Sequence, residues 1–328
     1  MRAPRFWDWR AGGHDFPAGL LSPAAWLYAA IGTLRQRRRP WCAPVPVLCC
    51  GNLTVGGTGK TTVALDLARR LVARQRRVAF LTRGYGGSIC QPVRVQAGVH
   101  TARDVGDEAM LLAEVAPCYV GADRARAARL AIADGADCLL MDDGLQNPGL
   151  RRDVSLVVVD GHQGFGNGRV LPAGPLREPV SSGLSRAQAV LLIGDDRTGL
   201  LRNLRPDLPC HHATLRQEET GLPVGCRVVA FAGIGRPSKF FDGIRNAGLD
   251  VRQAVAFADH HPYHRAELAQ LLKTAHTMNA RLVTTPKDFV RLPADVQARV
   301  TAIGVSLRWA DPRVPERLLD TWLREGER

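Results

Sequence analysis

Short apolar runs alternate with segments of helical periodicity along most of this chain. The runs at Val45–Cys50, Arg77–Thr82, Cys138–Met141 and Val154–Asp160 are nearly continuous, which is typical of strands covered on both faces. After Lys60, apolar residues recur at the spacing of an amphipathic helix. This repeated strand and helix order predicts an α/β fold, with a doubly wound, mostly parallel sheet whose ligand lies at the carboxyl ends of the strands.

The same alternation restarts after about Asp195. The strands predicted there are Arg227–Ala232, Val251–Phe257, Arg281–Thr284 and Ala302–Arg308. We therefore predict three units: an N-terminal helical segment over residues 1–43, a larger α/β domain over residues 44–194, and a second, smaller α/β domain over residues 195–328.

The N-terminal segment contains an uncharged stretch, Phe16–Leu34, followed at once by the basic run Arg35–Arg39. Pro, Gly and Ser interrupt its first third, so a helix is expected only from Pro23 to Leu34. Such a helix extends about 18 Å, short of a hydrocarbon core of about 30 Å, and does not span a membrane. It is either an amphipathic helix in the interface of an anionic leaflet or a helix packed on the core with solvated arginines.

The strongest chemical signal is a Gly-rich loop between a strand and a helix. It departs from the pattern G-x-x-x-x-G-K-[ST], because Thr54 stands at the first glycine position. Its backbone N–H groups are suited to cradle phosphates, with Lys60 at the β and γ phosphates and the Thr61 hydroxyl on Mg²⁺. Residues 44–194 are thus a predicted P-loop domain. The predicted nucleotide-binding residues are Thr54, Val55, Gly56, Gly57, Thr58, Gly59, Lys60, Thr61 and Thr62.

Other acidic residues and histidines carry weaker signals. Asp142 and Asp143 end an apolar strand after the loop, as expected of the Mg²⁺-ordering element of P-loop enzymes. Asp107 begins a helix, where capping alone is enough to explain an acidic residue. The histidines of FADHHPYH lack partner cysteines, so a zinc site is not expected there.

Charge and composition limit the classes of partner that the protein can have. A net charge of +13 indicates an anionic partner, which is a nucleic acid, a phosphorylated substrate or an acidic membrane surface. With 6% aromatic residues, the aromatic and basic pattern of a nucleic-acid ATPase is absent. The eight cysteines form no C-x-x-C pair and are interpreted as reduced and structural, which together with an ATP site indicates the cytoplasm.

Taken together, the motifs resemble the tetraacyldisaccharide 4'-kinases of lipid A synthesis. LPAGPLREP together with DDGLQ is far more specific than any P-loop, and the resemblance covers nearly the whole chain. The matching strings are GNLTVGGTGKT, TRGYGG, VGDEAMLL, GADR, DDGLQNP, GFGNGRVLPAGPLREP, AGIGRPSKFF and FADHH.

The resemblance implies a kinase that moves the γ-phosphate of ATP to the 4'-hydroxyl of tetraacyldisaccharide 1-phosphate, forming lipid IVA. It implies ATP and Mg²⁺ as cofactors, and a peripheral, monotopic place on the cytoplasmic face of the inner membrane. The implied partners are the lipid substrate and an anionic membrane surface, with no nucleic acid and no obligatory protein partner. The resemblance also favours an interfacial N-terminal helix and a C-terminal domain that completes the active-site cleft.

It further implies roles for individual residues. Asp107 would be the base for the sugar hydroxyl, helped by His260, and Glu178 would join Asp142 and Asp143 in the metal environment. The implied phosphate contacts are Arg83, Arg124 and Arg177. Three more site positions, in which substrate contact and loop support remain open, are Asn52, Tyr85 and Gln146.

The chain departs from the family in two places, and rival functions exist. Asn147-Pro148 stands where many relatives have His, and TTPKD replaces TTEKD. A P-loop kinase of a soluble sugar or nucleotide would share the loop and the aspartates. A deviant P-loop ATPase with a regulatory or metal-delivery role would need Lys where this chain has Val55, and a guanine-nucleotide switch would need N-K-x-D.

Overall fold

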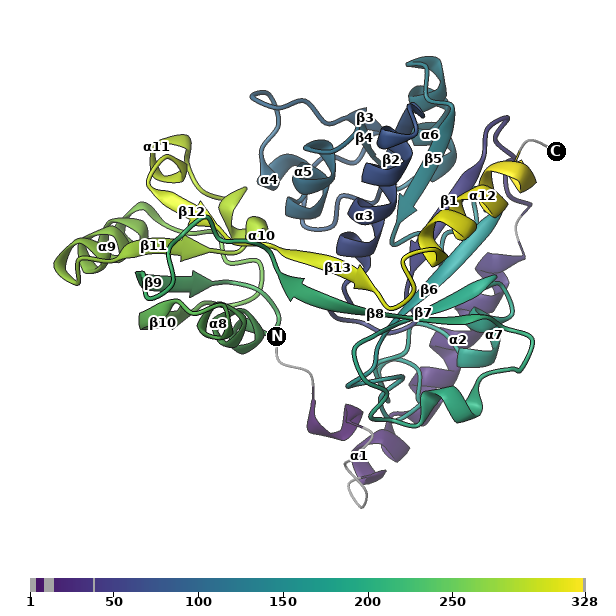
Figure 1. The fold of residues 1–328 in the computed structure, drawn as a ribbon. Helices are drawn as coiled ribbons and strands as arrows, with labels where there is room; N and C mark the ends of the chain where they lie inside the picture. Colours follow the sequence, from purple (N-terminus) through teal and green to yellow (C-terminus); the bar gives the residue numbers. More distant parts are fainter. Residues whose placement is uncertain (1–3, 9–14, 38, 327–328) are drawn as a thin grey trace.

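Two α/β lobes joined by a two-stranded ribbon make up the protein in this computed structural model (Figure 1). The structure describes residues 4–8, 15–37 and 39–326. Residues 1–3 and 9–14 of the predicted N-terminal unit, and Arg38 of its basic run, lie outside the described residues. The predicted α/β class is confirmed, because both sheets are mostly or wholly parallel.

The larger lobe is built on a sheet that has nine strands within the described residues, in the order β13-β8-β7-β6-β1-β5-β2-β4-β3. All neighbouring strands are parallel except the two outer pairs, β13 with β8 and β3 with β4. The strands are β1 Val47–Gly51, β2 Val78–Thr82, β3 Val93–Arg94, β4 Cys118–Val120, β5 Cys138–Asp142, β6 Val154–Asp160, β7 Ala189–Ile193, β8 Cys210–Gln217 and β13 Val305–Trp309.

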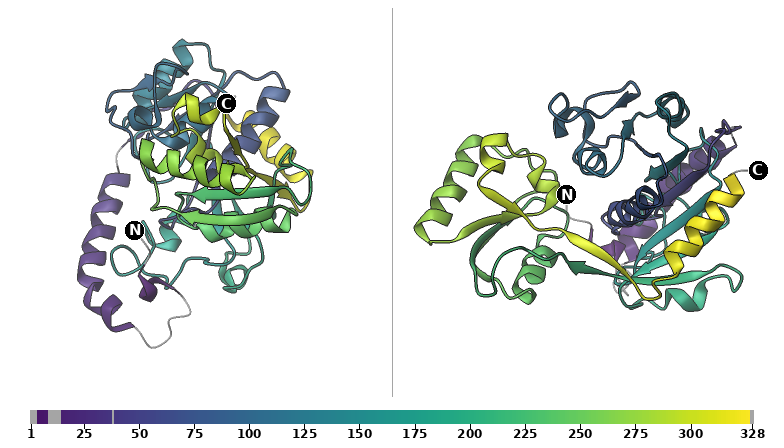
Figure 2. Two further views of the ribbon diagram at one scale, coloured as in Figure 1. Left: turned by 90° about the vertical axis from the view of Figure 1, so that its left-hand side faces the viewer. Right: turned by 45° about the horizontal axis from the view of Figure 1, so that its top comes forward.

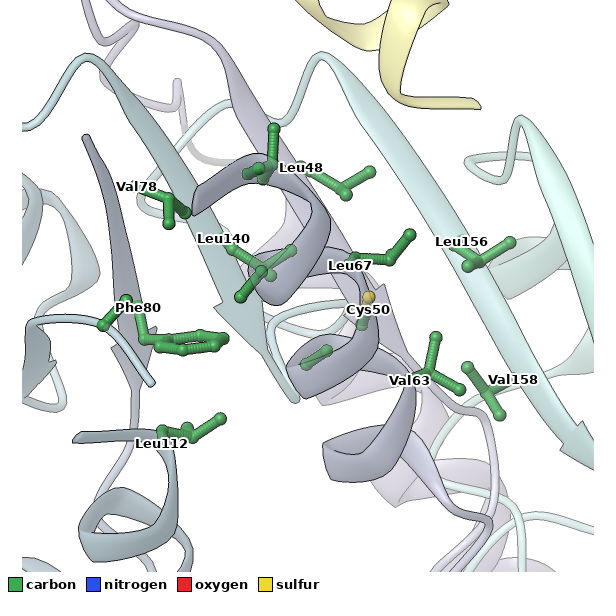
Figure 3. Close-up of a cluster of buried hydrophobic side chains, with 14 of the residues drawn as sticks. Leu48, Cys50, Val63, Leu67, Val78, Phe80, Leu112, Leu140, Leu156 and Val158 are labelled. Carbon is green, nitrogen blue, oxygen red and sulfur yellow. The ribbon is translucent and has the colours of Figure 1, made fainter. Parts of the chain in front are cut away.

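Helices cover both faces of this sheet. The faces are set by strand alternation, since Leu48 and Cys50 of β1 point to one core and Val47 and Cys49 to the other. Figure 3 shows the first core, where side chains of four strands pack beneath α3. On that face lie α3 Lys60–Ala73, α5 Asp107–Ala113 and α12 Val314–Gly326; on the other lie α6 Arg124–Ala133 and α7 Val180–Leu184. The short helices α4 Ala102–Val105 and η2 Leu200–Asn203 lie in connections.

The smaller lobe is a parallel four-stranded sheet in the order β10-β9-β11-β12. Its strands are β9 Arg227–Ala232, β10 Asp250–Ala256, β11 Arg281–Thr284 and β12 Val300–Ala302. One core packs against α8 Pro237–Asn246 and the other against α9 Arg265–Thr277 and α11 Ala294–Gln297. The one-turn helix α10 Pro286–Phe289 follows β11 and faces α5 of the larger lobe.

The chain crosses between the lobes through β8 and β13, which pair with each other in antiparallel register. The expectation of one strand over Ala302–Arg308 is therefore wrong. β12 ends at Ala302 in the small sheet, and the chain turns at Gly304 before β13 enters the large sheet. A Cβ at Gly304 would come within 2.3 Å of Glu218 Oε2, so a larger residue at this crossing would require the Glu218 side chain to move. The predicted division at residue 195 stays a prediction.

The N-terminal elements are η1 Arg5–Trp7, α1 Asp15–Leu20 and α2 Ser22–Gln36. Figure 2 shows α2 as a long helix along the edge of the molecule. Its large apolar side chains are exposed, with 74% of Trp26 and 62% of Leu34 accessible. Over residues 4–8, 15–37 and 39–326, no helix is both long and apolar enough to span a bilayer.

Candidate active site

The nucleotide loop lies at the carboxyl edge of the large sheet. β1 ends at Gly51, and α3 begins at Lys60, directly after Gly59 in the left-handed region with φ of 87°. The Gly- and Pro-rich segment at residues 164–179 supports the loop, because the Val55 N–H donates to the Pro175 carbonyl at 2.8 Å. Thr54 forms an isolated antiparallel bridge to Leu176. The loop is therefore held in place from outside its own strand and helix.

The rest of the loop exposes some groups and buries others. Gly56 and Gly57 are exposed, and Thr62 is partly buried in the first turn of α3. Lys60 and Thr61 are buried. The Thr58 hydroxyl is also buried and finds no hydrogen-bond partner among the described residues. A buried, unpaired hydroxyl in a Gly-rich loop is suited to meet a ligand oxygen.

Thr61 and Asp142 meet at the start of α3. Parallel register places Asp142 beside Cys50, and the Thr61 hydroxyl donates to Asp142 Oδ2 at 3.2 Å. Asp142 is completely buried, and its Oδ1 has no hydrogen-bond partner in the described part of the chain. Burial, and then the charge of Glu108, raise the pKa of Asp142 to about 7. A cation at this carboxylate would offset that cost, and hydroxyl and carboxylate oxygens are ligands that Mg²⁺ prefers.

Protein side chains alone do not complete a metal cage here. In residues 4–8, 15–37 and 39–326, no three His, Cys, Asp or Glu side chains are grouped to hold a metal. Mg²⁺ ordinarily binds one or two carboxylates and takes its other ligands from phosphates and water. The pair Thr61 and Asp142 fits such a site.

Asp143 takes part in a different set of contacts. Its Oδ1 accepts from Arg177 at 2.7 Å and lies 3.7 Å from Lys60 Nζ. Burial acts to raise the pKa of Asp143, but Lys60 and Arg177 outweigh it and the pKa is lowered. The residue adopts a positive φ of 56°, which is uncommon for a non-glycine residue and turns its side chain toward these cations.

Gln146 connects Glu178 to the loop. Its Nε2 donates to the Asn52 carbonyl at 3.0 Å and to Glu178 Oε1 at 2.9 Å. Arg186 donates to both oxygens of Glu178, at 2.6 and 2.7 Å. The Asn52 side chain donates to Thr54 O at 2.7 Å. Asn52 and Gln146 thus support the loop, and a metal-ligand role for Glu178 stays a prediction.

Asp107 and His260 meet across the two lobes. Asp107 is 3% exposed at the first residue of α5, and its Oδ2 lies 3.2 Å from His260 Nδ1. The turn before it requires glycine, because a Cβ at Gly106 would lie 2.5 Å from Tyr85 O. Burial acts to raise the pKa of Asp107, but His260 and then Arg291 outweigh it and the pKa is lowered. The bond to Asp107 raises the pKa of His260, against the smaller effect of burial.

The remaining predicted positions differ in exposure. Arg83 and Tyr85 are exposed, and the Tyr85 ring lies edge-on to His260 with centroids 5.8 Å apart. Arg124 is buried at the start of α6, where its NH1 donates to the Gly121 carbonyl. Within the described residues its Nε has no hydrogen-bond partner. Burial lowers the pKa of Arg124 to about 10, although Asp143 opposes the shift.

Two basic residues in the site were not predicted from the sequence. Lys287 Nζ donates to Glu108 Oε1, and Arg291 NH2 donates to Asp107 Oδ2. Lys287 lies in α10 and Arg291 in the turn that follows it, and no signal in the sequence pointed to their contacts with α5. His261 and His264 instead contact Glu267 at the start of α9, away from Asp107.

Known proteins resemble this chain over nearly its whole length. The family model described as "Tetraacyldisaccharide-1-P 4'-kinase" matches residues 17–324. A curated "Tetraacyldisaccharide 4'-kinase" of Gluconacetobacter diazotrophicus is 58% identical, over 98% of each chain, and that of Gluconobacter oxydans is 50% identical, over 97% of each. A crystal structure of LpxK from Aquifex aeolicus in complex with ATP is similar with a TM-score of 0.75 at 25% identity, covering 94% of this chain and 99% of that one.

Proposed function

The chain belongs to the tetraacyldisaccharide-1-P 4'-kinase family, and we propose that it transfers the γ-phosphate of ATP to the 4'-hydroxyl of tetraacyldisaccharide 1-phosphate, forming lipid IVA. The resemblance drawn from the motifs is thereby confirmed. The observation that carries the proposed chemistry is the meeting of Asp107 and His260 from two lobes.

On the nucleotide side, the loop from Thr54 to Thr62 binds the phosphates of ATP through backbone N–H groups, and Lys60 contacts the β and γ phosphates. Thr61 and Asp142 would hold Mg²⁺, in an acidic environment shared with Asp143 and Glu178. When bound, Mg²⁺ neutralises charge on the phosphates. The crystal structure of the Aquifex relative in complex with ATP supports the assignment of ATP as the nucleotide.

On the acceptor side, Asp107 orients the 4'-hydroxyl and takes its proton as the bond to the γ-phosphorus forms and the bond from that phosphorus to ADP breaks. The lowered pKa of Asp107 keeps it ionised, and the neutral form of His260, whose Nδ1 lies 3.2 Å from Asp107 Oδ2, can receive the proton from it. A weak base suffices because phosphoryl transfer depends mainly on positioning and charge neutralisation. Arg83, Arg124 and Arg177 contact phosphates of the substrate or nucleotide.

The protein binds its lipid substrate at a membrane surface. The exposed apolar side chains of α1 and α2, with Phe16 at 84% and Trp26 at 74% exposure, support attachment to the cytoplasmic face of the inner membrane. Arg35, Arg37 and Arg39 would face its anionic lipids. A kinase of a soluble sugar would share the loop and the aspartates but has no need of this apolar surface.

The test is transfer of label from γ-labelled ATP, with Mg²⁺, to tetraacyldisaccharide 1-phosphate in detergent micelles. The matched acceptor is the same disaccharide without acyl chains, and the matched variant is Lys60→Ala. We expect labelled lipid with the intact protein and none with the variant. Labelling of the soluble acceptor alone would contradict the lipid substrate, and undiminished transfer by Lys60→Ala would contradict the role of the loop.

A further inference from the structure

A pair of ionic contacts joins α10 of the smaller lobe, and the turn that follows it, to α5 of the larger lobe. Arg291 donates to Asp107, and Lys287 donates to Glu108. The first contact is the more buried, since the Arg291 side chain is 6% exposed and that of Lys287 is 33% exposed. A buried charge needs several fixed partners, and Arg291 has them.

The guanidinium of Arg291 is fixed from its own lobe. Its NH1 donates to Asp288 Oδ1 at 3.0 Å and to the Gly233 carbonyl at 3.1 Å. Asp288 is completely buried and accepts from Tyr263 Oη at 2.7 Å and from the Gly233 N–H at 2.9 Å. With NH1 so engaged, NH2 projects to Asp107, and one planar group bridges two carboxylates.

The same turn holds the other partner of Asp107. The Gly233 carbonyl that accepts from Arg291 also accepts from the His260 N–H at 3.0 Å. Both side chains then meet Asp107 Oδ2, while Asp107 Oδ1 accepts from the Glu108 N–H at 3.0 Å. The carboxylate of Asp107 is therefore oriented by donors from both lobes.

We propose that Arg291 is a positioning residue, which holds the Asp107 carboxylate in the orientation that joins Oδ2 to His260 and so readies the base when the lobes meet. This inference rests on the proposed function of Asp107. Arg291 acts through Asp107, since its own donors point to carboxylates and a carbonyl.

Without Arg291, Asp107 would be less firmly oriented and harder to ionise. Burial alone favours the neutral carboxyl, so the pKa of Asp107 would rise. The groups that act on Asp107 are His260, on the turn before α9, and Lys287 and Arg291, on and after α10. The acidic partners of these three groups are Asp259, Glu108 and Asp288. His260 and Lys287 remain in the variant, so part of the effect on Asp107 would remain.

The simpler alternative is that Arg291 only joins the lobes. The chain offers a matched control for this, because Arg236 of the smaller lobe donates to Asp160, at the end of β6, at 2.9 Å. This contact also lies at the carboxyl edge of the large sheet and also joins an arginine to an aspartate across the lobes. Arg236→Gln removes such a contact and leaves Asp107 untouched.

The experiment measures kcat and the KM for ATP of the full-length protein between pH 5.5 and 9, with tetraacyldisaccharide 1-phosphate in micelles, for Arg291→Gln, Arg291→Lys and Arg236→Gln. We expect Arg291→Gln to lower kcat about 10- to 100-fold with a KM for ATP within about twofold. The acidic limb of its kcat–pH profile, where kcat falls as the pH is lowered, moves to higher pH because the pKa of Asp107 rises. Arg291→Lys recovers part of kcat, because it keeps the charge but does not bridge two carboxylates. Arg236→Gln leaves the acidic limb in place.

An Arg291→Gln profile with an unmoved acidic limb and a kcat loss equal to that of Arg236→Gln would overturn the inference. If thermal unfolding shows that Arg291→Gln does not fold, Arg291→Lys is the variant that tests the positioning role. A wild-type kcat in Arg291→Lys would then overturn the inference. Asp107→Asn distinguishes a failure of the proposed function from a failure of the role proposed for Arg291. If it retains turnover, the proposed base is wrong; if it is inactive while Arg291→Gln behaves like Arg236→Gln, only the role of Arg291 is wrong.

Discussion

Asp142 and Asp107 are buried carboxylates of the same larger lobe, but their pKa values move in opposite directions. Asp142 has one oxygen on Thr61 and one without a hydrogen-bond partner in the described residues, and its pKa rises to about 7. Asp107 receives His260 and Arg291 from the smaller lobe, and its pKa falls. Burial acts on both in the same sense, so the partners decide the charge of each.

This difference separates the site into two halves. The proposed nucleotide half lies on one sheet, and at Asp142 one carboxylate oxygen has no hydrogen-bond partner in the described residues. The acceptor half is supplied with its cations by the other lobe, through the turn at Gly233 and the residues after α10. We therefore expect changes at Asp142 to be sensitive to Mg²⁺ and changes at Asp107 to be insensitive to it.

The largest expected effect is at Asp107. Asp107→Asn should lower lipid phosphorylation about 10²- to 10⁴-fold, because it removes the proton acceptor from the hydroxyl. Binding of ATP, measured by equilibrium dialysis, should stay within about twofold of wild type. Turnover near the wild-type rate would mean that Asp107 only caps its helix, and would contradict the contrast drawn between Asp107 and Asp142.

The next effect is at Asp142. Asp142→Asn should raise the Mg²⁺ concentration for half-maximal transfer about 10- to 100-fold, because a neutral amide holds the ion less firmly than a carboxylate. Asp160→Asn is the control, since Asp160 ends β6 of the same sheet but pairs with Arg236 and Lys239. An equal Mg²⁺ requirement for both variants would show that Asp142 is not a metal ligand.

A smaller effect is expected on membrane binding, which can be separated from ATP binding. Trp26→Glu places a charge on the exposed side of α2 and should weaken binding to vesicles that contain anionic lipid about tenfold. Its ATP binding should be unchanged. Val224→Glu serves as control, because Val224 is 85% exposed and lies on the smaller lobe. Equal vesicle binding by Trp26→Glu and wild type would contradict the interfacial role of α2.

The smallest effect concerns the pH dependence of stability. The pKa of His260 is raised in the folded state, so its bond to Asp107 stabilises the protein fully below its unfolded pKa of about 6.5. That contribution is lost as the pH rises through the folded pKa. His260→Gln should lower Tm by about 1–3 °C at pH 6 and by less at pH 9, since the ring is partly exposed. A constant difference across this range would mean that the ring is not protonated in the pair.

The nucleotide half was readable from the sequence because strand, loop and helix are contiguous there. Lys60, Thr61 and Asp142 follow from one strand order and one spacing, and the structure places them together. Arg291 could not be predicted, since it meets Asp107 only after the chain has left the large sheet through β8 and formed a second sheet. The break at Gly304 was missed for a related reason, because the apolar pattern runs across it while the backbone changes sheets.

The most direct measurement is a single-turnover transfer of labelled phosphate from bound ATP to the lipid, with Asp107→Asn and Asp142→Asn compared at low and at saturating Mg²⁺. We predict that saturating Mg²⁺ restores much of the transfer by Asp142→Asn and none of that by Asp107→Asn. Restoration of both variants, or of Asp107→Asn alone, would contradict the separation of the site into a metal-dependent nucleotide half and an acceptor half built by the second lobe.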